Sequence, residues 1–437
     1  MPSAVLYDRA VVSSTAQQQD PTAIRAWCLY DWANSAFTTL VVTFLYAAYF
    51  SENFAEDSGR GTALWSRGIT VSALLIAMLA PIAGAIADRG GRRKYLIACS
   101  LLCIVATTAL TFIQPGQSYA VITALGLFVI ANVAFEIALV FYNAFLPSIA
   151  TADRVGRISG YGWGLGYIGG LGALVVALAG FVSEPFWFGM TSEDGFNIRA
   201  TNVLVSAWFL VFSIPAFITL RDESTSRTSV SIRQAFGDLA STFRHLRRYR
   251  QVGRFLLARL IYNDGLVTIF AFGGIYAVGT FGFSFTELVT FGIVINVGAG
   301  LGAVTFGFLD DRIGGKATIV VSIIALAAAT VLGAVAATRA WFWVSAVMVG
   351  VFAGPNQSAS RSLMARFIPP KHEAEFFGFF AFSGKVTSFL GPLLFGVLAD
   401  VYNQRVGVGS LLMFFVIGGV LLWRVNETEG IVAARAA

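Results

Sequence analysis

The chain has 437 residues, of which 57% are hydrophobic and only 12% are charged, about half the charged fraction of an ordinary soluble domain. Uncharged stretches at 68–87, 317–338 and 406–423 are long enough to cross a bilayer as helices, which takes roughly 20 apolar residues. This composition excludes a soluble globular protein, and the net charge of +6 gives no reason to expect a nucleic-acid partner.

Residues 1–24 are polar and have no apolar core of a secretory signal, so the first span is expected to serve as the insertion signal. Twelve spans are predicted in chain order. They are 27–50, 64–87, 94–113, 119–146, 160–182, 201–220, 254–279, 285–309, 317–338, 341–364, 374–399 and 406–423. The basic, polar connector 221–251 divides the chain into two six-span bundles, 1–220 and 252–437.

The distribution of positive charge predicts the topology. With both termini on one side, the segments on that side hold 22 Lys and Arg residues, whereas the opposite side holds five. Cytoplasmic loops are enriched in Lys and Arg, so both termini are expected in the cytoplasm.

Cofactor chemistry is not expected. Cys28, Cys99 and Cys103 lie in or beside apolar stretches, and His245 and His372 are far apart in polar connectors. These positions form neither a disulfide framework nor a zinc pattern. The chain contains no G-x-x-x-x-G-K-[ST] loop, so an ATP-driven pump built on this chain alone is not expected.

Two connectors are near copies of each other, one after the second span and one after the eighth. Both have a glycine, an aspartate four residues later, an arginine next to it, and a glycine pair followed by a base. These positions are Gly84, Asp88, Arg89 and Arg92 in the first copy and Gly307, Asp311 and Arg312 in the second. We expect both loops to act as conformational gates at the cytoplasmic helix ends, the alternative being a relic of the fold without a role.

In this twelve-span context, the 84–94 loop resembles the signature of the major facilitator superfamily. Four further stretches are similar to the autophagy-related vacuolar effluxers and their bacterial relatives. They are 27–36, 142–147, 262–265, and 362–370 together with 374–378. The resemblance implies an all-α membrane protein with twelve transmembrane helices in two pseudo-symmetric six-helix bundles, working by alternating access. It also implies export of neutral amino acids, which is linked to the fungal members. The compact connectors look more like those of a bacterial member, so we expect the protein in the bacterial inner membrane. We also expect a monomer.

Six ionisable side chains fall inside the predicted spans, where each costs about 2.5–3.5 kcal/mol at mid-helix. They are Asp31, Glu136, Arg259, Asp264, Arg361 and Lys385. Three acids and three bases are expected to face a shared polar interior, together with the neutral side chains Asn34, Asn143 and Asn263. The resemblance implies that spans 1, 4, 7 and 10 line the cavity. These nine residues form the predicted site for substrate or protons.

Structural alternatives remain open for several of them. Asp31 can be a helix-entry acid paired with Arg25 or Arg259, Glu136 and Lys385 can form a purely structural bridge, and Arg361 can extend to the cytoplasmic interface. The expected activity is secondary transport of a small polar or zwitterionic solute in contact with the lipid bilayer, with protons as a candidate coupling ion. The alternatives are an exporter of amphiphilic compounds or drugs and a non-transporting receptor. No cluster of nucleophile and base suggests an enzyme.

Overall fold

A computed structural model describes residues 20–222, 249–370 and 372–436. The connector expected at 221–251 lies largely outside the described residues, and so does His245. The described residues form helices joined by short connectors, and no strand occurs among them.

The N-terminal half contains six membrane-crossing segments. They are Pro21–Asn53 (α1 Pro21–Ala36, the π-helical η1 Phe37–Phe44 and α2 Leu45–Asn53), α3 Ser58–Gly90, α4 Arg92–Leu110, α5 Ala120–Ala144 followed by the short α6 Leu146–Ile149, α7 Val155–Ala177 with η2 Leu178–Val182, and α8 Phe196–Thr219. The C-terminal half contains six more. They are α10 Arg250–Phe281, α11 Phe285–Ile313, α12 Gly315–Val335, α13 Arg339–Phe367, α14 Glu373–Lys385 with α15 Leu390–Val401, and α16 Gln404–Ser410 with α17 Leu412–Trp423; α18 Glu427–Arg435 follows.

Polar side chains mark where several of these helices begin. Asp20 accepts a hydrogen bond from the backbone of Thr22 at the start of α1. Ser284 and Glu287 form a reciprocal capping box at the start of α11. Such caps satisfy backbone N–H groups that have no partner inside the helix. The long helices between the caps follow from the apolar runs of the sequence.

The twelve-span prediction is confirmed, although hydropathy alone finds eleven of the spans among the described residues. The twelfth is α13, which has 29 residues but a polar C-terminal half. Asn356, Ser358, Ser360, Arg361 and Ser362 are each at most 3% exposed there. A helix this polar can lie within a bilayer because its neighbours, and not lipid, surround it.

The eleventh and twelfth spans are not continuous helices. The segment expected at 374–399 is interrupted by a turn at residues 386–389, between α14 and α15. The last span is interrupted at Leu411, between α16 and α17. Breaks in membrane helices occur where protein or a cavity, and not lipid, contacts the exposed backbone.

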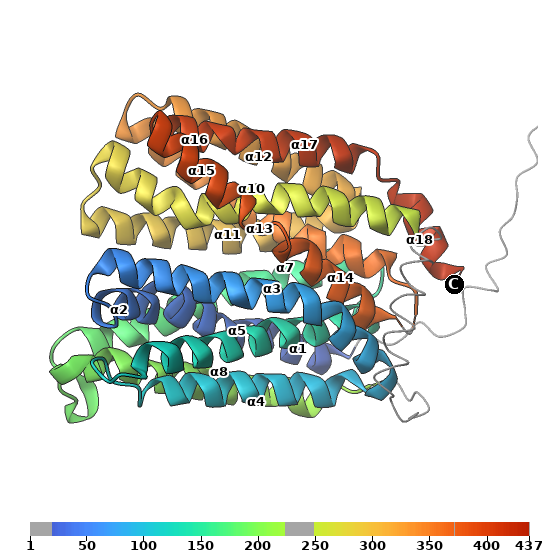
Figure 1. Cartoon of the computed structure of the whole chain (residues 1–437). Coiled ribbons are helices and arrows are strands. Elements are labelled where there is room, and N and C mark those ends of the chain that lie inside the picture. Colours follow the sequence, from blue (N-terminus) through green and yellow to red (C-terminus); the bar gives the residue numbers. More distant parts are fainter. Residues whose placement is uncertain (1–19, 223–248, 371, 437) are drawn as a thin grey trace, which may run out of the picture.

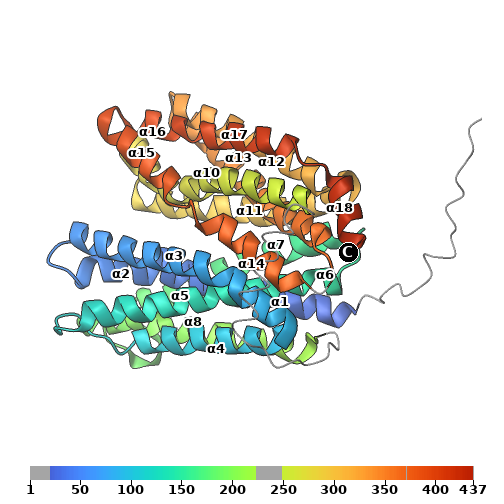
Figure 2. The ribbon, with the colours of Figure 1, turned by 45° about the vertical axis from the view of Figure 1, so that its right-hand side comes forward.

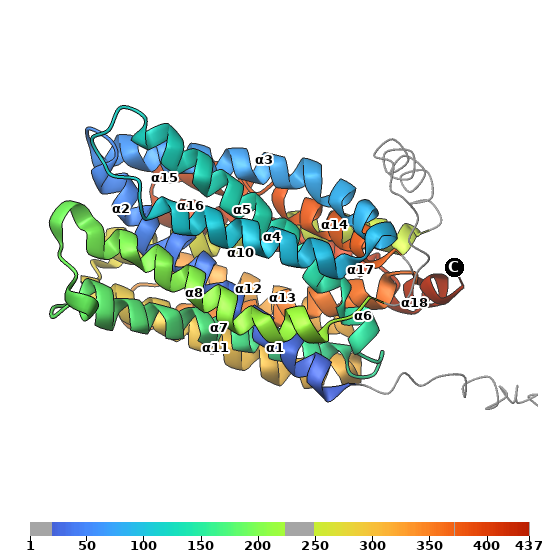
Figure 3. The ribbon, with the colours of Figure 1, turned by 90° about the horizontal axis from the view of Figure 1, so that it is seen from below.

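The two halves lie side by side, with the N-terminal half in blue to green and the C-terminal half in yellow to red (Figure 1). The helices run along the length of the molecule, and α18 lies beyond one end of the bundle (Figure 3). We call this the termini end, because α1 also begins there, and the opposite end the open end. In Figure 2 the ribbons of the two halves approach each other at the termini end and diverge toward the open end.

Candidate functional site

A cavity of about 780 Å³ lies between the two halves. Its wall comes from α1, η1, α5 and α7 of the N-terminal half and from α10, α11, α12, α13, α14, α15 and α16 of the C-terminal half. Leu288 and Phe342 belong to the first turns of α11 and α13 at the open end, whereas Asp31 and Arg361 lie deeper along their helices. The cavity therefore extends from the open end toward the middle of the bundle.

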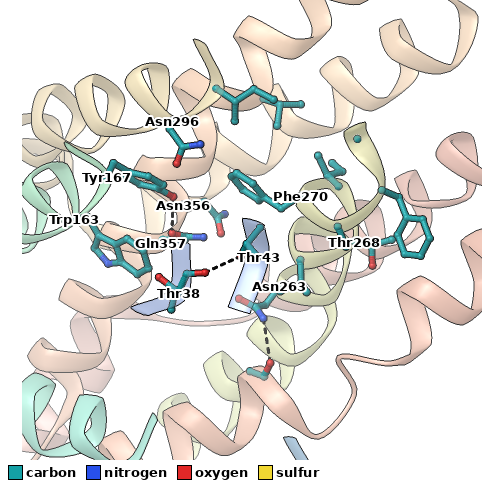
Figure 4. A pocket seen from close by; sticks show the side chains of 18 of the residues that line it. Thr38, Thr43, Trp163, Tyr167, Asn263, Thr268, Phe270, Asn296, Asn356 and Gln357 are labelled. Carbon is teal, nitrogen blue, oxygen red and sulfur yellow. Dashed lines mark hydrogen bonds between the residues drawn. The ribbon is translucent and has the colours of Figure 1, made fainter. Parts of the chain in front are cut away.

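Polar side chains from both halves face this space. Tyr167 of α7 donates a 2.8 Å hydrogen bond to the side-chain oxygen of Gln357 of α13, so the two halves touch through neutral groups here (Figure 4). Asn263 of α10 donates to the carbonyl of Gly384 at 3.4 Å, and Trp163 of α7 stands on the opposite wall (Figure 4). Asn34 and Asn143 also line the cavity.

Asp31 and Arg361 form an ion pair across the interface between the halves. Nη1 of Arg361 donates to Oδ2 of Asp31 at 2.9 Å, and both side chains are almost fully buried. Asn34 donates to the other carboxylate oxygen at 3.5 Å. The partner of Asp31 is therefore Arg361 and neither Arg25 nor Arg259, and the Arg361 side chain is enclosed instead of extending to the membrane interface.

The remaining contacts of Arg361 also come from the N-terminal half. Its Nε donates to the hydroxyl of Ser159 at 2.9 Å and its Nη2 to the Ser159 carbonyl at 2.7 Å. Its guanidinium carbon lies 4.6 Å from the ring centre of Trp27 and 5.5 Å from that of Trp163. A cation on α13 is thus held in a polar and aromatic cage of the other half. The cage permits no Cβ at position 162, because one on Gly162 would lie 2.7 Å from Asp31.

Glu136 and Lys385 form a second ion pair between the halves, and the predicted contact is present. Nζ of Lys385 lies 2.6 Å from Oε1 of Glu136, with side-chain exposures of 30% and 17%. Both residues line the cavity. This pair is more accessible than the one formed by Asp31 and Arg361, so a solute in the cavity can reach it.

Arg259 and Asp264 differ in where their side chains lie. Arg259 lines the cavity, and its Nη1 donates to the carbonyl of Phe380 at 2.7 Å and to the hydroxyl of Ser383 at 2.8 Å. Asp264 is 1% exposed and is not part of the cavity wall. One of its carboxylate oxygens accepts a 3.3 Å hydrogen bond from the backbone of Gly391, in the first turn of α15, and the other has no partner among the described residues.

The first copy of the repeated loop closes the termini end against α14. Oδ1 and Oδ2 of Asp88 accept hydrogen bonds from the backbone N–H groups of Ala374 and Glu375 at 2.9 and 2.8 Å. The carboxylate of one half therefore caps the positive end of a helix from the other half. Gly84 makes this approach possible, because a Cβ there would lie 2.1 Å from the carbonyl oxygen of Ala374.

The second copy does the same with α7. Oδ1 and Oδ2 of Asp311 accept from the backbone of Gly156 and Arg157 at 2.8 and 3.3 Å, and the Arg157 side chain adds an ion pair. A Cβ at Gly307 would lie 2.9 Å from the Arg157 backbone. The two loops thus make equivalent contacts that are related by the internal repeat. In each loop the glycine lets a helix of the other half pack closely, and the aspartate then caps that helix.

The basic residues of these loops differ from one another in their contacts and exposure. Arg92 lies 3.7 Å from Glu373 at the start of α14, and also donates to the Ala144 carbonyl at 2.5 Å. Arg89 is half-buried, whereas Arg312 is exposed on the termini end and enters no ion pair among the described residues. Arg92 thus adds an ion pair between the two halves to the contacts made by the acids and glycines of the repeat.

Some residues of this interface were not found from the sequence. Ser159 carries two of the contacts of Arg361, and no pattern in the chain distinguishes it from other serines. Asp310 forms a 2.5 Å ion pair with Arg366, and its place beside Asp311 in the repeated loop was an available signal. Tyr167 was also missed, because it becomes the partner of Gln357 only when α7 and α13 are brought together.

The chain is similar to known transporters over most of its length. Residues 61–435 match the family described as "Vacuole effluxer Atg22 like". The chain is 32% identical over 412 residues to "Uncharacterized MFS-type transporter YxiO" of Bacillus subtilis (strain 168), covering 92% of this chain and 94% of that protein. It is 24% identical to "Autophagy-related protein 22" of Yarrowia lipolytica, covering 78% and 72% of the two chains.

Among solved structures, the fold is similar to that of the transporter FucP in its outward conformation, with a TM-score of 0.73 and 13% identity. That match covers 92% of this chain and 98% of the FucP chain. Together with the twelve spans, the internal repeat and the central cavity, these findings identify a multi-pass membrane protein. The chain belongs to the vacuole effluxer Atg22-like family of major facilitator superfamily transporters.

Proposed function

We propose that the protein is a secondary active transporter that exports a small zwitterionic solute, a neutral amino acid or a similar metabolite, by alternating access. The observation that carries the proposal is the cavity of about 780 Å³ between the halves, accessible from one end and closed at the other by two helix-capping aspartates. Alternating access requires a central site and a closure that can be exchanged between the two ends.

The proposed orientation puts the termini end in the cytoplasm of a bacterial cell. It is supported by the excess of Lys and Arg on that side, 22 residues against five. In this orientation the structure corresponds to an outward-open state. The protein would work as a monomer in the inner membrane, because each chain contains both halves and the complete cavity between them.

Amino-acid cargo is supported by the charges of the cavity and by the family. A zwitterion requires both signs, and Glu136, Lys385 and Arg259 supply them where a solute can reach. The Yarrowia relative is named for autophagy and the family for vacuolar efflux, which supports export over uptake. The volume is ample, because drug-sized ligands occupy pockets of roughly 300–1,000 Å³.

Export of amphiphilic compounds is the second candidate, and one observation favours it. The part of the cavity toward the open end is lined by phenylalanines. They are Phe270, Phe272, Phe291 and Phe342. An apolar wall binds amphiphiles without requiring a zwitterion, so the two candidates differ in their need for the charged residues.

Protons are the proposed coupling ion, with Asp264 and Asp31 as the candidate sites. Asp264 is buried and has no cationic partner within 4.0 Å among the described residues, whereas Asp31 is paired with Arg361. A carboxyl group that lacks a cation in one conformation and gains one in another would bind and release a proton.

Counterflow in vesicles of purified protein tests the proposal. Vesicles preloaded with an unlabelled neutral amino acid should accumulate the labelled form, and a pH gradient should then drive net uphill movement. Accumulation of a labelled amphiphile together with indifference to every amino acid would favour the second candidate. Transport that ignores an imposed pH gradient would exclude the proton as the coupling ion.

A further inference from the structure

Arg259 is the cation in the cavity that lacks a carboxylate. Within the part of the chain that the structure describes, the charged residues of the cavity wall are two acids and three bases. Asp31 is paired with Arg361, and Glu136 is paired with Lys385. Arg259 has no carboxylate within 4.0 Å among the described residues, so the wall carries one unneutralised positive charge.

The guanidinium of Arg259 is held in place by groups that do not neutralise it. Its carbon lies 3.6 Å from the ring centre of Phe380, and Nη1 is occupied by the Phe380 carbonyl and the Ser383 hydroxyl. Gly384 lets α14 pack against it, because a Cβ there would lie 2.9 Å from Nη1. A guanidinium fixed in this way loses little conformational freedom when a ligand binds.

Two donor positions of Arg259 remain unused. Nε is buried and makes no hydrogen bond with any described residue, and the hydrogen bonds of the side chain use Nη1. Nε has almost no accessible surface, so Nη2 is the donor that a solute in the cavity can reach, and a guanidinium N–H forms a strong, charge-assisted hydrogen bond with a carboxylate. Arg361 offers no such donor, because Ser159 occupies its Nε and Nη2 and Asp31 accepts from its Nη1.

We infer that Arg259 binds the carboxylate of the transported solute through Nη2, which makes it the residue that selects carboxylate-bearing substrates. The inference rests on the proposed function and specifies the group that is recognised. The ammonium of a zwitterion would then face the Glu136 side of the cavity, and the aliphatic part the phenylalanines toward the open end. A monocarboxylate fits better than a phosphate, because the wall has one unneutralised positive charge.

The experiment compares four related compounds on the purified full-length protein. They are valine, valinamide, 3-methylbutanoate and isobutylamine, with binding measured by calorimetry and by ligand-induced thermal stabilisation. The wild type should bind valine and 3-methylbutanoate and should bind the two compounds without a carboxylate at least tenfold more weakly. Equal affinity for valine and valinamide would overturn the inference without any mutant.

Variants then assign the effect to the side chain. Arg259→Gln should weaken binding of both carboxylates by about ten- to a hundredfold, the loss expected for a hydrogen-bonded charged group. Arg259→Lys keeps the charge but not the guanidinium, so its affinity for both carboxylates should fall between those of the wild type and Arg259→Gln. This variant keeps the inference testable if Arg259→Gln does not fold. Arg254→Gln removes a cation from the same helix near the termini end and should change nothing.

The outcomes separate this inference from the proposed function. If 3-methylbutanoate binds through Arg259 and no amino acid does, the inference stands and the proposed cargo is wrong. If valine is transported but Arg259→Gln and Arg259→Lys bind it as tightly as the wild type, the cargo stands and the inference is wrong. If neither valine nor 3-methylbutanoate binds, both the inference and the proposed cargo are wrong.

Discussion

Asp88→Asn and Asp311→Asn should shift the protein toward a state open at the termini end. Each aspartate accepts two backbone N–H groups of a helix from the opposite half. Asparagine keeps one acceptor oxygen, loses the negative charge, and turns an amide NH₂ toward a backbone donor. Both contacts exist only while that end is closed, so their loss acts on the conformational equilibrium.

The magnitude follows from the contacts. A charge at a partly buried helix terminus is worth up to about 2 kcal/mol, and a lost N-cap typically costs about 1 kcal/mol. Each substitution should therefore shift the ratio of the two states by roughly 5- to 30-fold, corresponding to about 1–2 kcal/mol. The two aspartates share no partner, so the double variant should approach the sum of the effects.

Cysteine accessibility measures the shift. Val304 of α11 packs against Gly164 of α7, at the contact between the two halves. A cysteine at position 304 should therefore be labelled faster from the termini end in the variants than in the background. Leu288→Cys lines the cavity at the open end and should label more slowly. The background has its three native cysteines replaced by alanine.

Matched controls exist in the same protein. Asp222 caps the first turn of α4 and Glu427 caps that of α12, each within its own half. Asp222→Asn and Glu427→Gln remove similar hydrogen bonds without separating the halves, so they should leave the labelling of both reporters unchanged. Unchanged labelling in Asp88→Asn and Asp311→Asn, or an equal change in the controls, would refute the reasoning.

Three further predictions concern single side chains. Glu136→Gln and Lys385→Met should each lower thermal stability, by less than the roughly 3–5 kcal/mol of a fully buried pair, because both partners are partly accessible. The double variant should lose less stability than the sum of the two single losses. Additive losses in this double-mutant cycle would mean that the two residues do not interact. Asp264→Asn should abolish proton-driven uphill transport in vesicles while solute exchange persists, and persistence of uphill transport would remove Asp264 as the coupling site. The Glu375 hydrogen bond raises the pKa of His372 above its ordinary value of 6.5. This contact therefore stabilises the folded protein below about pH 6.5, and the stabilisation is lost as the pH rises through the raised pKa. The difference in melting temperature between wild type and His372→Gln should be largest near pH 5, and a difference that is independent of pH would contradict this.

The sequence predicted the spans well and their interruptions poorly. Apolar runs determine which segments lie in the bilayer, because each buried charge is costly there. The break between α14 and α15 was not predicted, although residues 386–389 are Val-Thr-Ser-Phe and Gly391-Pro392 follows them, a dipeptide that is typical of turns. A membrane helix can break only where neighbouring protein satisfies the freed backbone groups, and Asp264, more than 120 residues earlier, accepts one of them from Gly391.

The sequence also predicted which charged side chains belong to the interior, but pairing was predicted unevenly. Glu136 and Lys385 were expected to meet and do. The partner of Asp31 is 330 positions away in Arg361, a contact for which Arg25 and Arg259 were the competing predictions. Asp264 was grouped with the cavity residues and is absent from the wall. Depth along a helix follows from counting residues, whereas the direction of a side chain depends on how the helix is rotated in the bundle.

The sequence by itself determined that this is a membrane protein with two related halves, which glycines and acids are repeated between them, and which charges must be buried. These properties are local, since they depend on hydropathy, spacing and identity along the chain. Only the tertiary structure decided that each repeated aspartate caps a helix of the other half, that Arg361 is enclosed by the N-terminal half, and that Arg259 has no carboxylate partner among the residues that the structure describes. Those contacts depend on how two bundles dock, and many dockings satisfy the same pattern of apolar and polar residues.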